Sequence, residues 1–95
     1  MKAYELLSDE SKWCQGQFAV DKYGNEINQD NKDTVKWCLE GALMHCYVGQ
    51  DGDAYYTAYQ RISKALTAGQ GISSWNDDPA RTYAEVYDLL KRLDI

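Results

Sequence analysis

One stretch of regularly spaced apolar residues in the middle of the chain constrains the fold most. The spacing predicts a helix from about Asp33 to Val48, with Gly49 as a left-handed stop. Side-chain oxygens that can cap its start are offered by Asp30, Asn31 and Asp33. One face of this helix carries Val35, Cys38, Leu39, Ala42, Leu43 and Cys46, and the opposite face carries Trp37, Met44 and Val48. Because a helix that is apolar on two sides needs neighbours on both, we expect it at the centre of the fold.

Gly41 lies inside this predicted helix, where glycine costs about 1 kcal/mol relative to alanine. The residue lies close in angle to Trp37 and Val48. We interpret it as allowing either the close approach of another backbone or room for a tryptophan ring.

Three further helices and one hairpin complete the predicted architecture. We expect a first helix over Lys2–Asp9 and a third over Asp53–Ala68, ended by Gly69. A fourth helix begins at a capping box of Thr82 and Glu85. In that helix Asp88 and Arg92 are spaced for an i,i+4 ion pair. The hairpin consists of a strand over 17–21, a turn over 22–25 and a strand over 26–28, and residues 71–79 are an extended segment that ends in a turn. The predicted fold class is mainly α, a compact four-helix domain with a small β-hairpin.

Length and charge exclude several classes of protein. The chain has 95 residues, so we expect a single domain, 1–95. Ten Lys and Arg against 15 Asp and Glu give a net charge of −5, which argues against binding to nucleic acid or to an anionic membrane surface. No apolar run is long enough to span a bilayer, and the first residues do not resemble a signal peptide, so we expect a cytoplasmic protein.

The three cysteines are interpreted as buried free thiols, because their number is odd and the expected compartment is reducing. A Cys14–Cys38 disulfide is the alternative. A zinc site would draw on the cysteines and His45, but ligands spaced two to four residues apart on a turn are absent. A Cys/His nucleophile pair is disfavoured because Cys38 faces the apolar stripe. The sequence therefore predicts no metal, no cofactor and no catalytic residue.

The segment Trp75-Asn76-Asp77, together with Arg81, is the sharpest candidate for a binding site. In one interpretation the Asn and Asp side chains bond to the turn backbone while Trp75 fills the core, and we favour this structural role. In the other, the polar cluster binds a ligand or the backbone of a partner. Tyr23 at the hairpin tip and Tyr56 on the polar side of the third helix are candidate anchors at a protein interface, or ordinary surface tyrosines.

Two segments resemble the signature of a family of small bacterial and phage proteins classified as a domain of unknown function. They are Trp37-Cys38-Leu39-Glu40-Gly41-Ala42-Leu43, and Trp75-Asn76-Asp77 followed by Arg81-Thr82 and Glu85-Val86. Trp13, Gly16 and Asp21-x-x-Gly24 also resemble that family, so the resemblance covers about Trp13 to Leu93. It implies a bacterial or phage setting and brings no activity with it.

Two hypotheses for function follow. The first is a small acidic, non-catalytic protein that binds another protein, and the lack of a convincing catalytic set favours it over an enzyme. The alternative is a small-molecule-binding protein or enzyme with a pocket near Trp13, Trp37 and Trp75 and with Asn76, Asp77 and Arg81 at its rim.

Overall fold

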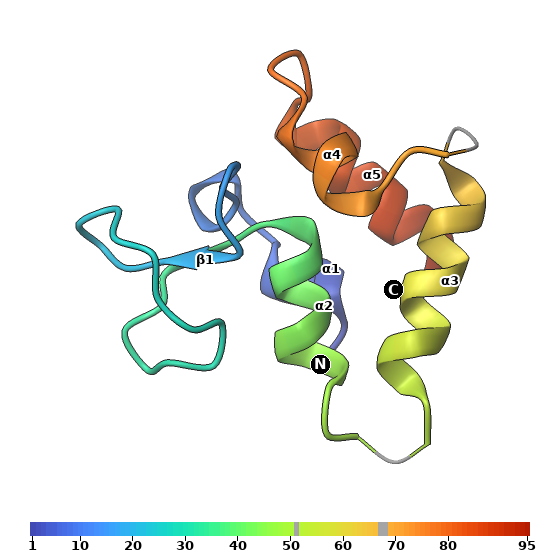
Figure 1. Ribbon diagram of the computed structural model, residues 1–95, viewed down its shortest axis with the longest axis horizontal. Coiled ribbons are helices and arrows are strands. Elements are labelled where there is room, and N and C mark those ends of the chain that lie inside the picture. The colour runs from blue at the N-terminus through green and yellow to red at the C-terminus, as the bar shows by residue number, and fades with distance from the viewer. Residues whose placement is uncertain (51, 67–68) are drawn as a thin grey trace.

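A computed structural model describes residues 1–50, 52–66 and 69–95. It contains five α-helices and a two-stranded antiparallel sheet (Figure 1). The elements are α1 (Ala3–Leu6), a 3-10 turn η1 (Glu10–Lys12), β1 (Ala19–Val20), β2 (Lys36–Trp37), α2 (Leu39–Tyr47), α3 (Ala54–Ala65), α4 (Ile72–Asp77) and α5 (Tyr83–Leu93). The fold is mainly α, as predicted, but the prediction of four helices is wrong.

The additional helix is α4, in the segment that the sequence predicts as extended. Its residues Ile72, Trp75 and Asn76 follow an i, i+3, i+4 spacing, and their side chains turn toward the molecule: Ile72 and Asn76 are buried and Trp75 is half-buried. Burial of this short stripe outweighs the turn preference of Ser73, Ser74 and Asn76, so the segment becomes helical.

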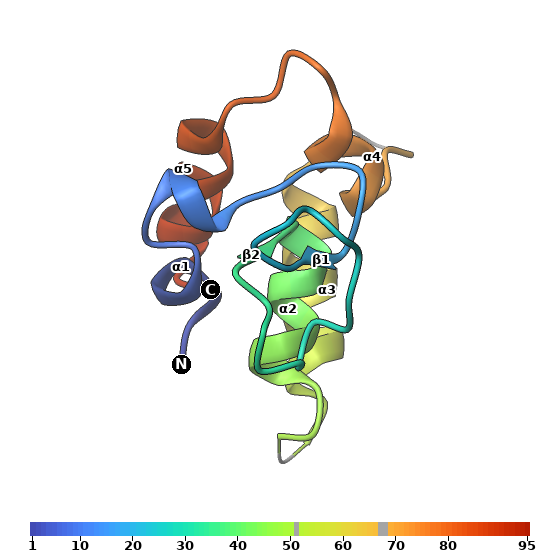
Figure 2. The same ribbon diagram turned by 90° about the vertical axis from the view of Figure 1, so that its left-hand side faces the viewer.

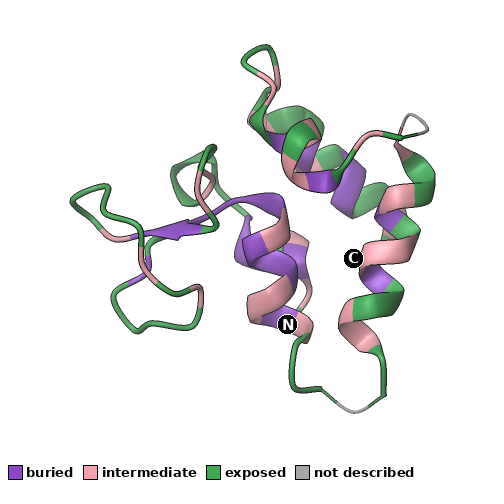
Figure 3. Ribbon diagram, viewed as in Figure 1, coloured by how far each residue is buried: buried purple, intermediate pink, exposed green. Residues whose placement is uncertain are grey.

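Helix α2 lies at the centre of the fold, as predicted, and contacts α1, α3, α4 and β2 (Figures 1 and 2). Its buried side consists of Leu39, Gly41, Ala42, Leu43 and Cys46 (Figure 3). The other predicted apolar side is only partly covered, because Met44 is half-buried and Val48 is exposed.

The start of α2 differs from the prediction: Trp37 and Cys38 precede the helix. Cys38 has an extended backbone and caps the helix, with its Sγ accepting a hydrogen bond from the amide of Gly41 at 3.3 Å. Trp37 lies in β2, where it pairs with Ala19 on one side and forms a parallel bridge with Trp13 on the other. Because both backbone edges of this segment have partners in the sheet, helical geometry would leave those partners unsatisfied.

Gly41 allows another backbone to approach α2 closely, which confirms the first of the two interpretations of this residue. A Cβ at position 41 would lie 2.0 Å from the carbonyl oxygen of Phe18. That oxygen accepts a hydrogen bond from the amide of Cys38 at 3.1 Å, so it is held against the first turn of α2. Glycine is therefore required where the sheet crosses the helix.

Residues 17–37, which we call the arm, project from the helices on the left of Figure 1. The predicted hairpin is only partly present, since β1 pairs with β2 and not with a strand over 26–28. The returning segment forms a single bridge between Val20 and Glu26, and the amide of Ile27 donates to Ala19 at 3.1 Å. The predicted turn is present, with Gly24 at φ +83°. None of the three side chains expected to cap α2 does so, because Asp30, Asn31 and Asp33 lie in the arm.

The other helices keep their predicted places with shifted ends. Helix α1 is shorter than predicted, because the side chain of Asp9 caps η1 instead. Helix α3 covers Ala54–Ala65, and positions 67 and 68 of its predicted range lie outside the described residues. The capping box of Thr82 and Glu85 at the start of α5 is confirmed.

The expected Asp88–Arg92 ion pair is not among the ion pairs of the described residues, which join Lys2 to Asp94, His45 to Asp30 and Arg81 to Glu85. Both side chains are exposed, where hydration competes well with pairing.

Three elements fix the end of α5 beside α1. The amide of Ala3 donates to the carbonyl of Ile95 at 2.6 Å, and Nζ of Lys2 donates to the carbonyl of Asp94 at 3.0 Å. The hydroxyl of Tyr47 donates to Ile95, and the guanidinium of Arg61 donates to the carbonyl of Leu93. These donors satisfy carbonyl groups that the end of a helix leaves without partners.

Candidate functional site

Asn76 is the centre of the predicted corner, and its side chain is fully buried at 0 % exposure. Its Oδ1 accepts hydrogen bonds from Nε1 of Trp13 at 2.7 Å and from the amide of Leu39 at 3.1 Å. Its Nδ2 donates to the carbonyl of Cys14 at 3.2 Å and to Oδ1 of Asp77 at 2.9 Å. The amide thus joins α4 to the start of α2 and to the segment before the arm, and all of its bonding capacity is used inside the protein.

Asp77 and Arg81 are also engaged by the protein itself. Oδ1 of Asp77 accepts from the amide of Gly16 at 2.9 Å. The Nε of Arg81 donates to the carbonyl of Trp75 at 2.9 Å, and its Nη1 donates to Glu85 at 2.8 Å. The Cζ atom of Arg81 lies 3.9 Å from the centre of the Trp75 ring, in a cation–π contact.

The four residues of the corner, Trp75, Asn76, Asp77 and Arg81, therefore lie together, as the sequence suggests. The hydrogen bonds of their polar side chains described above are all made to other groups of the protein. Glu85 extends this network: hydrogen bonds from Thr82 and then the Arg81 side chain lower its pKa. Hydrogen bonding of this kind stabilises the ionised carboxylate.

An open cleft of about 290 Å³ lies beside the corner, between the end of α3 and helices α4 and α5. Trp75 and Arg81 line it, together with Leu66, Glu85, Leu89 and Arg92, among others. Its lining does not include Asn76, Asp77, Trp13 or Trp37, so the pocket that the alternative hypothesis expects is present only in part.

The three cysteine thiols are poorly reactive toward reagents in solution. Burial raises the pKa of Cys38 and of Cys46 to about 11 and the pKa of Cys14 to about 12, and all three are free cysteines. A thiol rather than a thiolate is a poor nucleophile and a poor metal ligand.

His45 does not face a thiol. Its Nδ1 lies 2.9 Å from Oδ1 of Asp30 in the arm, and its ring centre lies 5.4 Å from that of Trp37. Within the ranges 1–50, 52–66 and 69–95, no three His, Cys, Asp or Glu side chains gather where they could hold a metal ion.

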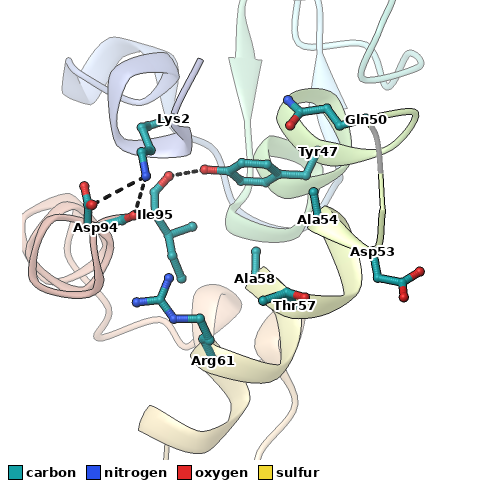
Figure 4. Close-up of a pocket in the computed structure, with 10 residues that line it drawn as sticks. All are labelled: Lys2, Tyr47, Gln50, Asp53, Ala54, Thr57, Ala58, Arg61, Asp94 and Ile95. Carbon is teal, nitrogen blue, oxygen red and sulfur yellow. Dashed lines mark hydrogen bonds and ion pairs between the residues drawn. The ribbon is translucent and has the colours of Figure 1, made fainter.

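A second small pocket, of about 260 Å³, lies where the two ends of the described chain meet (Figure 4). Figure 4 shows Tyr47 pointing at Ile95, and Lys2 reaching Asp94. The cations that line this pocket, Lys2 and Arg61, already bind carbonyl groups of residues 93–94. The pocket is therefore the solvent-facing side of the contacts that fix the end of α5.

The two predicted surface tyrosines are exposed, Tyr23 at 76 % and Tyr56 at 62 %. They do not form one surface, because Tyr23 belongs to the arm and Tyr56 to α3, which lie on opposite sides of α2 in Figures 1 and 2. Tyr56 accepts a hydrogen bond from Gln60 at 2.9 Å. Tyr23 instead lines an open groove of about 410 Å³ with Val35 and the polar residues Asp21, Lys22, Lys32 and Asp33.

Sequence reasoning does not single out Tyr83 and Tyr87, which lie at the edge of the buried side of α5. Both are half-buried, whereas Val86, Leu89 and Leu90 of the same helix are buried. The signal in the sequence is their i,i+4 spacing at the edge of the apolar stripe, where a side chain has one covered side and one exposed side.

Among the helices of the described part of the chain, none combines the length and apolar character needed to cross a bilayer. Neither a search of curated proteins nor a search of solved structures gave a match. The model of a family of unknown function, DUF6197, matches residues 1–93, which is nearly the whole chain. This match agrees with the expected resemblance to a domain-of-unknown-function family. The chain belongs to this family of unknown function, DUF6197.

Proposed function

We propose that this protein is a non-catalytic module that binds another protein through the arm. The observation that carries the proposal is a group of exposed apolar side chains on one projecting segment. Phe18, Tyr23 and Val35 are 45 %, 76 % and 40 % exposed, and all belong to the arm. Exposed aromatic residues beside a groove are typical anchors of protein interfaces. We also propose that the protein is cytoplasmic and of bacterial or phage origin.

The loops of the arm are held in shape by their own side chains. Oδ1 of Asp21 accepts from the amides of Tyr23 and Asn25 at 2.8 and 3.0 Å. The same short-range pattern recurs twice in the second loop, where Asn28 accepts from Asp30 and Asn31 accepts from Asp33. Such bonds reduce the number of conformations that a loop can adopt.

The arm is also fixed to the helical body. The amide of Cys14, outside the arm, donates to the carbonyl of Trp37 at 3.1 Å, and the side chain of Asp30 contacts His45 of α2. The carbonyl of Phe18 is held against Gly41. A loop that is rigid before binding loses less conformational entropy in the complex, so its exposed groups contribute more of their contact energy to affinity.

The occupant that fits the groove is an apolar side chain of a partner protein, flanked by polar groups. Tyr23 and Val35 supply the apolar walls, while Lys22, Lys32 and Asp33 can pair with charged groups around it. Lys22 lies 5.1 Å from the ring centre of Tyr23, so the ring already has a cation on one side. We expect Tyr23 to contribute most of the binding energy and the lysines to contribute little.

Site-specific photocrosslinking tests this proposal. A photoreactive phenylalanine analogue replaces Tyr23, or Tyr56 as the matched control, in cells that naturally encode the protein. We expect one discrete crosslinked protein from position 23 and none from position 56. The purified partner should then bind Tyr23→Ala at least about ten-fold more weakly than wild type, with an unchanged melting temperature. Equal binding of wild type and Tyr23→Ala would refute the role of the arm.

Small-molecule binding at the cleft beside the corner is the second candidate, supported by the exposed Arg92 and the half-buried Trp75 in its lining. A screen for compounds that raise the melting temperature tests it. A compound bound there should lose its effect in Arg92→Ala and keep it in Tyr23→Ala. The reverse pattern would assign the compound to the arm.

A further inference from the structure

Two tyrosines on α5 form a second aromatic surface, separate from the arm. Tyr83 and Tyr87 are one helical turn apart, with ring centres 5.8 Å apart. With Ala84, Glu85, Asp88 and Lys91 they line an open hollow of about 700 Å³ on the outer side of the helix. We call these six residues the tyrosine face. Helix α5 contacts α1 and lies away from the loops of the arm (Figures 1 and 2).

The tyrosine face is fixed by contacts with the first part of the chain. The hydroxyl of Tyr83 donates to the carbonyl of Leu7 at 2.6 Å. The Tyr83 ring also lies 6.5 Å from that of Trp13, at an interplanar angle of 51°. The position of Tyr83, and with it the ring that Tyr87 packs against, is therefore set before any partner binds.

Carboxylates surround these rings. Asp88 and Glu85 belong to the tyrosine face, and Asp9 and Glu10 lie close enough to help raise the pKa of Tyr83, after burial and the neighbouring Tyr87. Hydrogen bonds from Ser11 lower the pKa of Asp9, so this carboxylate is ionised at neutral pH. Glu85 is paired with Arg81, which leaves Asp88 as the carboxylate on α5 best placed to meet an incoming cation.

Two cations of α5 and of the loop before it already lie over aromatic rings. Nζ of Lys91 lies 4.6 Å from the ring centre of Tyr4, and Arg81 covers Trp75. Neither Tyr83 nor Tyr87 has such a partner within the part of the chain that the structure describes. Lys91, the cation of the tyrosine face, thus lies over another ring, and Tyr87 lines the hollow with its ring packed on Tyr83.

We propose that the tyrosine face binds an arginine-bearing segment of a partner protein, with the guanidinium stacked on Tyr87 and paired with Asp88. Arginine fits better than lysine because its planar group stacks on a ring while its N–H groups reach a carboxylate. The net charge of −5 also attracts a basic segment over distance. This surface is independent of the arm, so either assignment can fail without the other.

An NMR titration tests the proposal. The probe is an acetylated and amidated octapeptide with three arginines, added to ¹⁵N-labelled protein, and the matched peptides carry lysine or glutamate instead. We expect the arginine peptide to shift amide signals within residues 83–91 and 9–13. The lysine peptide should bind about two- to five-fold more weakly, and the glutamate peptide should cause no shifts. Shifts confined to the arm, or equal shifts with all three peptides, would overturn the proposal.

Variants separate stacking from general charge attraction. Tyr87→Leu keeps an apolar side chain without a π face, and it should weaken binding of the arginine peptide about two- to five-fold. Asp88→Asn should weaken it to a similar extent and should reduce the dependence of binding on salt. Tyr56→Ala on α3 is the control and should bind as wild type does. Unchanged affinity of Tyr87→Leu for the arginine peptide would contradict the proposal. Amide shifts at the tyrosine face that depend on protein concentration in the absence of peptide would also contradict it, because they would assign this face to contact with a second copy of the chain.

Discussion

Replacing Gly41 with alanine tests the packing of the arm on the central helix. The added Cβ would lie 2.0 Å from the carbonyl oxygen of Phe18 and 2.9 Å from its carbonyl carbon. Moving that oxygen even to 3.0 Å requires a displacement of 3.0 − 2.0 = 1.0 Å. The neighbour is backbone rather than the end of a flexible side chain, so the backbone at Phe18, just before β1, has to move away from α2.

The expected magnitude follows from three effects. Forcing an extra methyl group into a packed contact costs about 1–3 kcal/mol. Separating Phe18 from Cys38 breaks a backbone hydrogen bond of 3.1 Å and adds about 1–3 kcal/mol for the buried groups left unpaired. The better helix propensity of alanine returns about 1 kcal/mol. Together these effects predict that Gly41→Ala lowers the free energy of unfolding by about 1–5 kcal/mol, a large part of the roughly 5–15 kcal/mol available to a domain.

Urea denaturation followed by tryptophan fluorescence measures this change as a lower midpoint. Gly71→Ala is the matched control, because a Cβ there meets nothing within 4 Å and its φ of −76° suits alanine. We expect the control to stay within about 0.5 kcal/mol of wild type. If Gly41→Ala were as stable as wild type, or more stable, the close contact between Phe18 and α2 would be wrong.

Four further predictions concern the corner, the thiols and the last helix. Asn76→Ala should lower the free energy of unfolding by about 3–5 kcal/mol in urea denaturation, because it leaves polar groups of Trp13, Leu39 and Cys14 without buried partners. Asp77→Ala, at the exposed end of the network, should lower the free energy of unfolding by only about 1 kcal/mol. Alkylation of Cys38 by iodoacetamide at pH 8 should be about 100-fold slower in the folded protein than in urea, because a pKa of about 11 instead of 9.0 reduces the thiolate fraction by that factor. Comparable alkylation rates in the two conditions would refute the burial of Cys38. Thr82→Ala should cost about 1 kcal/mol by removing the helix cap, in the same denaturation assay. The carboxylate of Glu85 should stabilise the fold at pH values above its ordinary pKa of 4.5, and this effect should be lost as the pH falls through the lowered pKa that Glu85 has in the folded protein. The difference in urea midpoint between wild type and Glu85→Gln should therefore shrink in acid.

The parts of the fold that sequence analysis predicts correctly depend on neighbouring residues. The cap at Thr82 and Glu85 involves residues three positions apart, and Gly49 ends α2 at φ +89°. The close approach at Gly41 could also be inferred, because an interior glycine costs stability that some contact must offset. In each of these cases the physical cause lies within a few residues or in the residue itself.

The predictions that failed depend on partners far away in the chain. The backbone of Trp37 is paired with Trp13 and Ala19, so residues 36–38 stay extended although their apolar spacing suits a helix. The corner illustrates the same limit. Its residue types suggest a structural turn, but the bond between Trp13 and Asn76 spans 63 positions and leaves no periodic signal. The tyrosine face was hidden because half-buried and fully buried residues of α5 share one apolar stripe.

The hydrogen bonds that fix residues 93–95 to α1, α2 and α3 have a consequence for synthesis on the ribosome. Ala3, Tyr47 and Arg61 all bind carbonyl groups of residues 93–95. The first helix therefore cannot complete its native contacts until residue 95 has been synthesised and has left the exit tunnel. Contacts that join positions 3 and 95 form only after all of the intervening chain is available.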